Sequence, residues 1–173
     1  MKGVKIKQAK YFMQVIKQNQ LPYLLNEEKE VFDTVYKKIR DNKLFNKVGN
    51  IIEKEANRIV DEECKPEWER ISEEITKLND ERNELDKKEG KTEEENDRIK
   101  EISEKISELS SESEKVWQEA NIRLNKFKDD LIDGEYKDTN CFDLHDKEYD
   151  LVNRVIGWSV YDWQVEWNVI APN

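Results

Sequence analysis

Glycine, proline, histidine and cysteine are all scarce in this chain. Its 173 residues include five glycines, three prolines, two cysteines and a single histidine. The GxxxxGKS/T and GxGxxG loops that cradle phosphates and the GxSxG nucleophile elbow are all absent. The single histidine, His145, excludes a two-histidine metal site and leaves any catalytic triad with one base.

The two cysteines, Cys64 and Cys141, lie far apart with no regular spacing, so we expect free thiols in a reducing compartment. Cys141 and His145 stand near Asp143 and Asp146, but a structural zinc site needs four nitrogen or sulfur ligands. We therefore expect no metal, no cofactor and no catalytic residue. An enzyme that uses Cys141 or His145 is kept as an alternative.

Long apolar runs are also missing. No segment approaches the roughly 18 uninterrupted apolar residues needed to cross a bilayer, and the start MKGVKIKQAK has no long apolar region. Only 36% of the residues are hydrophobic and 40% are charged, which indicates a small core for this length. We expect a soluble cytoplasmic protein without a membrane partner.

The charge is acidic and uneven. The net charge is −10, yet residues 1–50 carry eleven basic and five acidic side chains. An acidic chain argues against nucleic-acid binding, which needs basic groups on phosphates. The candidate phosphate contacts are Lys2, Lys5, Lys7 and Lys10. Lysine outnumbers arginine by 23 to 7, a bias expected of an AT-rich bacterial or phage genome.

The middle of the chain carries two heptad patterns with spacings of three and four residues. The first comprises Trp68, Ile71, Ile75, Leu78, Arg82 and Leu85, and the second comprises Ile99, Ile102, Ile106, Leu109, Ser113 and Val116. Between them, Gly90 suits the left-handed end of one helix, and Thr92 with Glu95 forms a capping box for the next. The patterns predict a helical hairpin that pairs Leu85 with Ile99 and, at its base, Trp68 with Val116. A disordered acidic segment is the alternative.

The flanking segments also read as helices. Residues 9–19 predict a short helix, Asn26 begins a second, and a third starts near Asn50 and runs toward Pro66. Pro66 marks a first turn or a kink. The helix after the hairpin turn continues to Asp133 and Gly134.

The period of the hydrophobic pattern changes near the C-terminus. Apolar and polar residues alternate strictly over about 160–170, which predicts a β-strand. This strand either pairs with residues 3–7 in a small ribbon or adds to a partner's sheet; a helical continuation is the alternative. Its aromatic side chains either close the core or bind a partner, and the candidate partner-binding residues are Trp158, Trp163, Val165 and Trp167.

We therefore predict a mainly α protein with two parts. Residues 1–65 and 133–173 form a small helical body that ends in the short strand, and residues 66–132 form a protruding antiparallel coiled-coil hairpin. We interpret it as a non-enzymatic scaffold or adaptor that binds another protein through the hairpin, with homo-oligomerisation open. The alternative is a phage protein in the virion or host cytoplasm, either a virion connector or accessory subunit, or an acidic inhibitor of a host nucleic-acid-binding enzyme.

Overall fold

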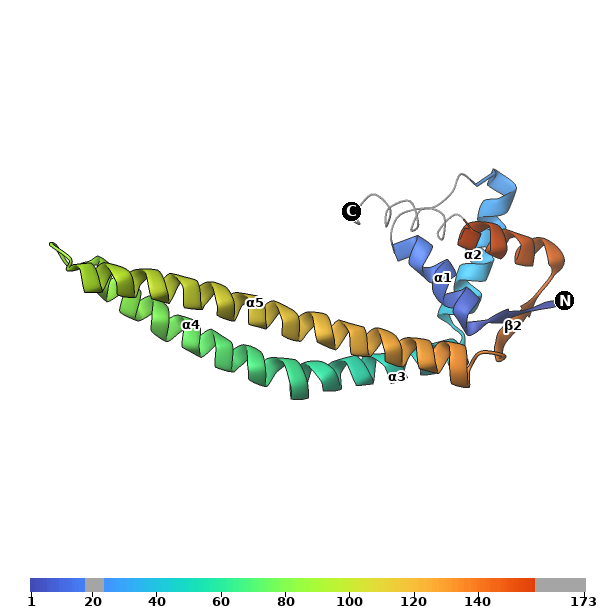
Figure 1. Cartoon of the computed structure of the whole chain (residues 1–173). Coiled ribbons are helices and arrows are strands. Elements are labelled where there is room, and N and C mark those ends of the chain that lie inside the picture. The colour runs from blue at the N-terminus through green and yellow to red at the C-terminus, as the bar shows by residue number, and fades with distance from the viewer. Residues whose placement is uncertain (18–23, 158–173) are drawn as a thin grey trace. The chain divides into compact units, whose positions relative to one another are not determined.

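A computed structural model describes residues 1–17 and 24–157 of the chain. Over these residues the protein is mainly helical, as predicted, with one small antiparallel sheet (Figure 1). Residues 146–157 are also helical. The elements in chain order are β1 (Lys2–Lys5), α1 (Ile6–Lys17), α2 (Asn26–Arg40), α3 (Lys43–Ile59), the π-helical turn η1 (Val60–Cys64), α4 (Lys65–Asp86), α5 (Glu93–Asp129), the π-helical turn η2 (Asp130–Glu135) and β2 (Asn140–Leu144).

The chain forms two compact units. The first contains Met1–Ile52 and Lys128–Asn173, and the second, Glu53–Phe127, contains the end of α3, η1, α4 and most of α5. The boundaries predicted from the sequence fall at residues 66 and 132, inside α4 and η2. None of the described helices combines the length and the apolar character that a membrane crossing requires.

The first unit begins with a strand that gives way early to a helix. The backbone N–H of Lys5 donates to Oε1 of Gln8 at 2.9 Å, which caps the helix that starts at Ile6. The sequence pattern had placed Ile6 and Lys7 in the strand and the helix start at residue 9. The capping interaction of Gln8 explains why the helix begins three residues earlier.

β1 does form a ribbon, and its described partner is β2. Gly3 pairs with Asp143 and Val4 with Phe142, and the register is interrupted between Val4 and Lys5. A Cβ at position 3 would collide with the side-chain amide of Asn140, so a larger residue there would require that side chain to move. The strand predicted over 160–170 lies outside the described residues. The sequence analysis missed β2 because NCFDL is short and does not alternate.

The core of the first unit is built from one stripe of each surrounding element. Phe12 of α1 is fully buried, and its ring centroid lies 5.0 Å from that of Phe32 of α2. The α1 residues share one helical face and meet the inner face of the ribbon. The buried members of the cluster are Val4, Ala9, Phe12, Val15, Phe32, Val35, Ile39, Leu144, Leu151, Val152 and Val155.

Asn42 ties helix α3 to the ribbon. Its side-chain oxygen accepts the N–H of Phe45 at 2.9 Å, and its side-chain amide donates to the carbonyl oxygen of Cys141 at 2.9 Å. An asparagine cap of this kind starts a helix at the next residue. The third helix therefore begins at Lys43, earlier than the predicted start near Asn50.

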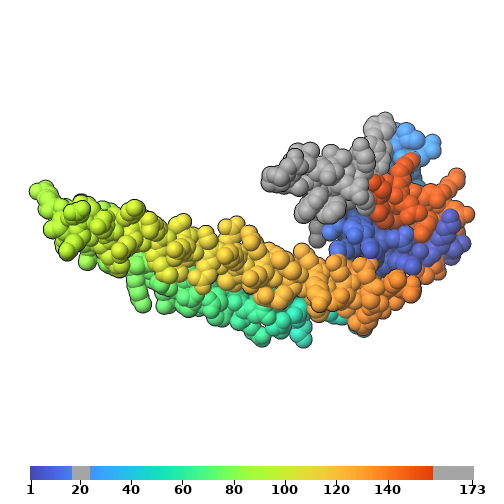
Figure 2. Space-filling model, viewed as in Figure 1, coloured from blue at the N-terminus to red at the C-terminus, as the bar shows by residue number. Residues whose placement is uncertain are grey.

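In the second unit, α4 and α5 lie side by side as an antiparallel hairpin (Figure 1 and Figure 2). Gly90 has a φ of 70°, and Thr92 and Glu95 cap each other at 3.0 and 3.2 Å, as the sequence predicted. Ile71, Ile102 and Leu109 are almost fully buried between the helices. The turn and the seam therefore define the hairpin together.

Two π-helical turns mark the other ends of these helices. η1 precedes α4, and Pro66 follows it in the first turn of α4, where its missing N–H leaves no helical bond unmade. Beside η1, Cys64 and Ile59 pack against Ala120 of α5. At the far end, α5 stops at Asp129 and η2 continues to Glu135, so the predicted helix end near Gly134 falls within η2.

Replacing Phe12 with alanine is expected to lower the stability of the first unit by about 3–5 kcal/mol, because it leaves a cavity against Phe32. Chemical denaturation followed by circular dichroism measures the loss. Ile122→Ala is the matched control, since Ile122 is 68% exposed and should change stability by no more than about 0.5 kcal/mol. A Phe12→Ala midpoint equal to that of the control would contradict the core assignment.

Candidate interaction surface on the helical hairpin

One edge of the hairpin is closed by ion pairs between its two sides. Each partner lies beside the seam, and most come one position before a seam residue: Arg70 precedes Ile71, and Arg98 precedes Ile99. The guanidinium of Arg98 donates to both oxygens of Glu81 at 2.8 and 3.1 Å. We call this the paired edge, and its ion pairs are Glu63–Arg123, Arg70–Glu112, Glu81–Arg98 and Lys88–Glu95.

The opposite edge has a different chemistry. Each helical residue turns by about 100°, so the residue after a seam position points away from the paired edge. The residues at these positions are mostly small and uncharged, and no cross-helix salt bridge joins the two helices there among the described residues. We call it the hydroxyl edge, and it comprises Ser72, Thr76 and Asn79 of α4 with Ser103, Ser107, Ser110 and Trp117 of α5, together with Trp68.

Three of the five hydroxyls of this edge are already hydrogen-bonded within their own helices. Thr76 Oγ1 donates to the carbonyl oxygen of Ser72 at 2.8 Å, and Ser110 Oγ donates to that of Ile106 at 2.9 Å. Ser103 Oγ makes the equivalent bond to Ile99 at 3.0 Å. These donors need no water, so a partner that covered them would leave no donor unsatisfied.

Two tryptophans stand exposed at the base of the hydroxyl edge. Trp68 is 49% exposed and Trp117 is 39% exposed. The prediction that Trp68 packs in the seam opposite Val116 is therefore only partly met. Three residues span about 300°, so Trp68 is rotated by about 60° from Ile71 toward Ser72. A seam between two helices has one layer, and it is too narrow to enclose an indole at that angle.

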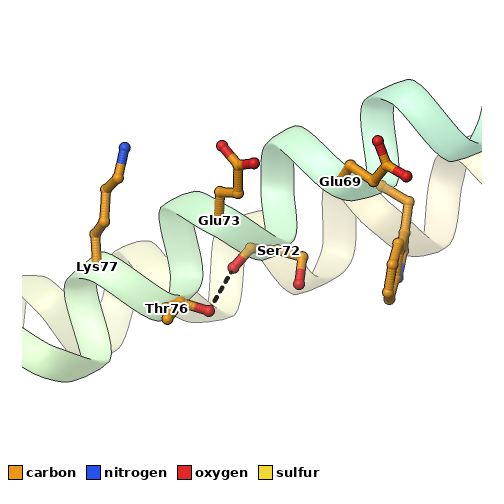
Figure 3. Close-up of a pocket in the computed structure, with 6 residues that line it drawn as sticks. Glu69, Ser72, Glu73, Thr76 and Lys77 are labelled. Atoms are coloured by element: carbon orange, nitrogen blue, oxygen red, sulfur yellow. Dashed lines mark hydrogen bonds between the residues drawn. The ribbon is translucent and has the colours of Figure 1, made fainter.

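Trp68 forms one wall of an open groove of about 360 Å³ on α4. Figure 3 shows Ser72 and Thr76 on one side of the helix, with Glu73 and Lys77 projecting from another. Glu69 completes the lining. The groove thus combines an aromatic wall, two hydroxyl residues, two carboxylates and one ammonium group.

The carboxylates of this groove have no salt-bridge partner among the described residues. The guanidinium of Arg70, which follows Glu69 in the chain, instead binds Glu67, Glu74 and Glu112. Residues 53–127 as a whole contain 24 acidic and 15 basic side chains. The hairpin unit therefore carries a net charge of −9, nearly all the charge of the chain.

Ion pairs lower the pKa of several carboxyls near the paired edge. Arg98 lowers the pKa of Glu81 by hydrogen bonding, and Lys88, together with the backbone N–H of Thr92, lowers the pKa of Glu95. Both carboxyls are partly exposed to solvent, so these shifts report local pairing. They do not mark a desolvated catalytic site.

The candidate phosphate-binding lysines lie in the first unit, and three of them face aspartates. Lys7 Nζ lies 2.9 Å from Asp133, which raises the pKa of Lys7 through the hydrogen bond. Lys10 is half-buried, and burial lowers its pKa. The other two pairs are Lys2 with Asp146 at 3.9 Å and Lys5 with Asp138 at 3.6 Å. These aspartates reduce the positive field that phosphate contacts would need.

The remaining candidate reactive residues are Cys64, Cys141 and His145. Burial raises the pKa of Cys141 to about 11, and Cys64 is fully buried with a raised pKa. His145 is exposed, and its backbone N–H donates to Glu148 Oε2 at 3.3 Å at the start of helix 146–157. Within the described residues no three His, Cys, Asp or Glu side chains gather as a metal site.

The predicted partner-binding residues Trp158, Trp163, Val165 and Trp167 lie outside the described residues. No family model, curated protein or solved structure matches the chain. The hydroxyl edge was missed in the sequence, although its signal is present: Ser, Thr or Asn follows seven of the seam residues, while charged residues precede several of them.

Replacing Arg98 with alanine is expected to lower the melting temperature at pH 7 and to have little effect near pH 2. The folded pKa of Glu81 is below its unfolded value of about 4.3, so the pair stabilises the hairpin above that pH and its contribution is lost on acidification. Thermal unfolding followed by circular dichroism at both pH values measures this difference.

Lys100→Ala is the matched control for that experiment, because it removes the same charge from an exposed side chain of α5 that forms no described salt bridge. An Arg98→Ala deficit that persists at pH 2, or that Lys100→Ala reproduces at pH 7, would rule out a specific Arg98–Glu81 contribution.

Proposed function

We propose that the protein is a non-enzymatic interaction protein that binds another protein through the hydroxyl edge of its hairpin. The observation that carries this proposal is the pair of half-exposed indoles, Trp68 and Trp117, at one end of an uncharged edge. Tryptophan is enriched at the centres of binding interfaces, where it contributes a large apolar area at small entropic cost.

The different chemistry of the two edges supports a single docking face. On the paired edge, guanidinium and carboxylate groups already satisfy one another, so a partner there would have to displace them. On the hydroxyl edge, the hydroxyl donors of Thr76, Ser103 and Ser110 are bonded within their own helices, so burying them costs little free energy. A partner would therefore gain most by covering Trp68 and Trp117 from that side.

A second candidate is a phage-encoded acidic inhibitor whose charge imitates phosphate and which occupies the nucleic-acid site of a basic host enzyme. The net charge of −9 on the hairpin unit favours it. Such an inhibitor should be displaced by duplex DNA, whereas binding through the indoles should resist that competition.

Photo-cross-linking can locate the docking face. A benzoylphenylalanine at Ser110, on the hydroxyl edge, is expected to capture a discrete partner in a lysate of the source cell. The same group at Ser111, turned by about 100° onto the outer face of α5, should not. Adding Trp68→Ala and Trp117→Ala to the Ser110 probe should remove the product.

Equal capture from positions 110 and 111, or no capture from either, would contradict binding through this edge. A product that survives the loss of both indoles would also contradict it. Mass analysis of the product distinguishes a different protein from a second copy of the chain.

A further inference from the structure

The groove beside Trp68 has the chemistry of a receptor for cationic side chains. The indole offers a π face, and two carboxylates without described salt-bridge partners, Glu69 and Glu73, line the same groove. A guanidinium or ammonium group stacked on tryptophan and paired with carboxylates gains both cation–π and ionic attraction.

The distribution of arginine contacts explains why these two carboxylates are available. Arg70, on the same helix, is fixed by Glu67, Glu74 and Glu112. Its guanidinium faces the paired edge, and Glu69, the preceding residue, is turned by about 100° from it around α4. Lys77 also lines the groove, four residues after Glu73, so the groove carries a net charge of −1, which favours a basic group from another molecule.

The hydroxyl edge has the length and the small residues that a packed helix needs. It lies along two antiparallel helices, and the stretch from Trp68 to Asn79 extends for about 17 Å. A third helix packs on such a pair at an interaxial distance of about 8–10 Å and needs small residues beneath it. Ser72, Thr76, Ser107 and Ser110 supply those small residues.

Building on the proposed function, we infer that the partner contributes an α-helix with an apolar stripe and flanking arginines or lysines, and that this helix packs on the hydroxyl edge with a basic side chain over Trp68. A second copy of the chain fits less well. It would bring another hairpin of net charge −9 against the first, and it would set Glu69 and Glu73 near their own copies.

The test uses two synthetic 18-residue amphipathic helices with the same leucine stripe, one with arginine on its polar face and the other with glutamate. Isothermal titration calorimetry with the full chain is expected to detect binding of the arginine peptide only. Glu69→Gln with Glu73→Gln should weaken that binding about tenfold, and Trp68→Ala should weaken it at least as much.

Glu104→Gln with Glu119→Gln is the matched control, because it removes the same charge from α5 away from the hydroxyl edge. Ile122→Ala tests whether any exposed apolar residue matters. Both controls should bind the arginine peptide within about twofold of the unaltered chain. Circular dichroism of each variant checks that the hairpin is retained.

Three results would overturn the inference: equal binding of both peptides, unchanged affinity after loss of Glu69 and Glu73, or an equal loss in the Glu104 and Glu119 control. A fourth contradicting result would come from sedimentation of the free chain: a dimer that the Trp68→Ala substitution dissociates. If Ser110 cross-links a partner while the arginine peptide fails, only the cationic chemistry is wrong. If the peptide binds as expected while Ser110 captures nothing, the proposed function fails instead.

Discussion

The contact between α4 and α5 is the interaction on which the hairpin depends. Few side chains maintain it, since Ile71, Ile102 and Leu109 are the seam residues that are almost fully buried. Their register is set by the turn at Gly90 and by the Thr92–Glu95 capping box, with a ladder of ion pairs along one side. A slip of one heptad would move every neighbour by about 10 Å and break both the ladder and the layers of burial. The register therefore decides which residues reach solvent on each edge.

The hairpin could be predicted from the sequence because each of its determinants is local or periodic. The seam spacing, the glycine in the left-handed region and the capping box can all be read along the chain. β2 could not be predicted, because its pairing with β1 joins segments more than a hundred residues apart and its residues do not alternate. The exposure of Trp68 was not predicted either. Its heptad position is correct, but its side chain is rotated from that of Ile71, and a seam of only two helices has no further layer to cover the indole.

Charge is distributed differently on the two edges of the hairpin. Arginines on the paired edge neutralise the carboxylates beside them, while Glu69 and Glu73, which share a groove with Trp68 and Lys77, form no salt bridge among the described residues. In the first unit the opposite holds, because aspartates neutralise Lys2, Lys5 and Lys7. Among the described residues, the second unit thus presents two exposed indoles near carboxylates without salt bridges, whereas Lys2, Lys5 and Lys7 of the first unit are paired. This combination agrees with recognition of a basic protein helix better than with recognition of nucleic acid.

A distance between spin labels at Thr76 and Ser107 tests the hairpin register most directly. Both positions lie on the hydroxyl edge at nearly the same level, and Cys64 and Cys141 can be replaced by alanine and serine so that the labels report alone. Double electron–electron resonance should give one narrow distribution at about 15–25 Å, since paired helices lie about 8–10 Å apart and each label adds several ångströms. A broad distribution, or one centred beyond about 35 Å, would show that α4 and α5 do not pair in this register.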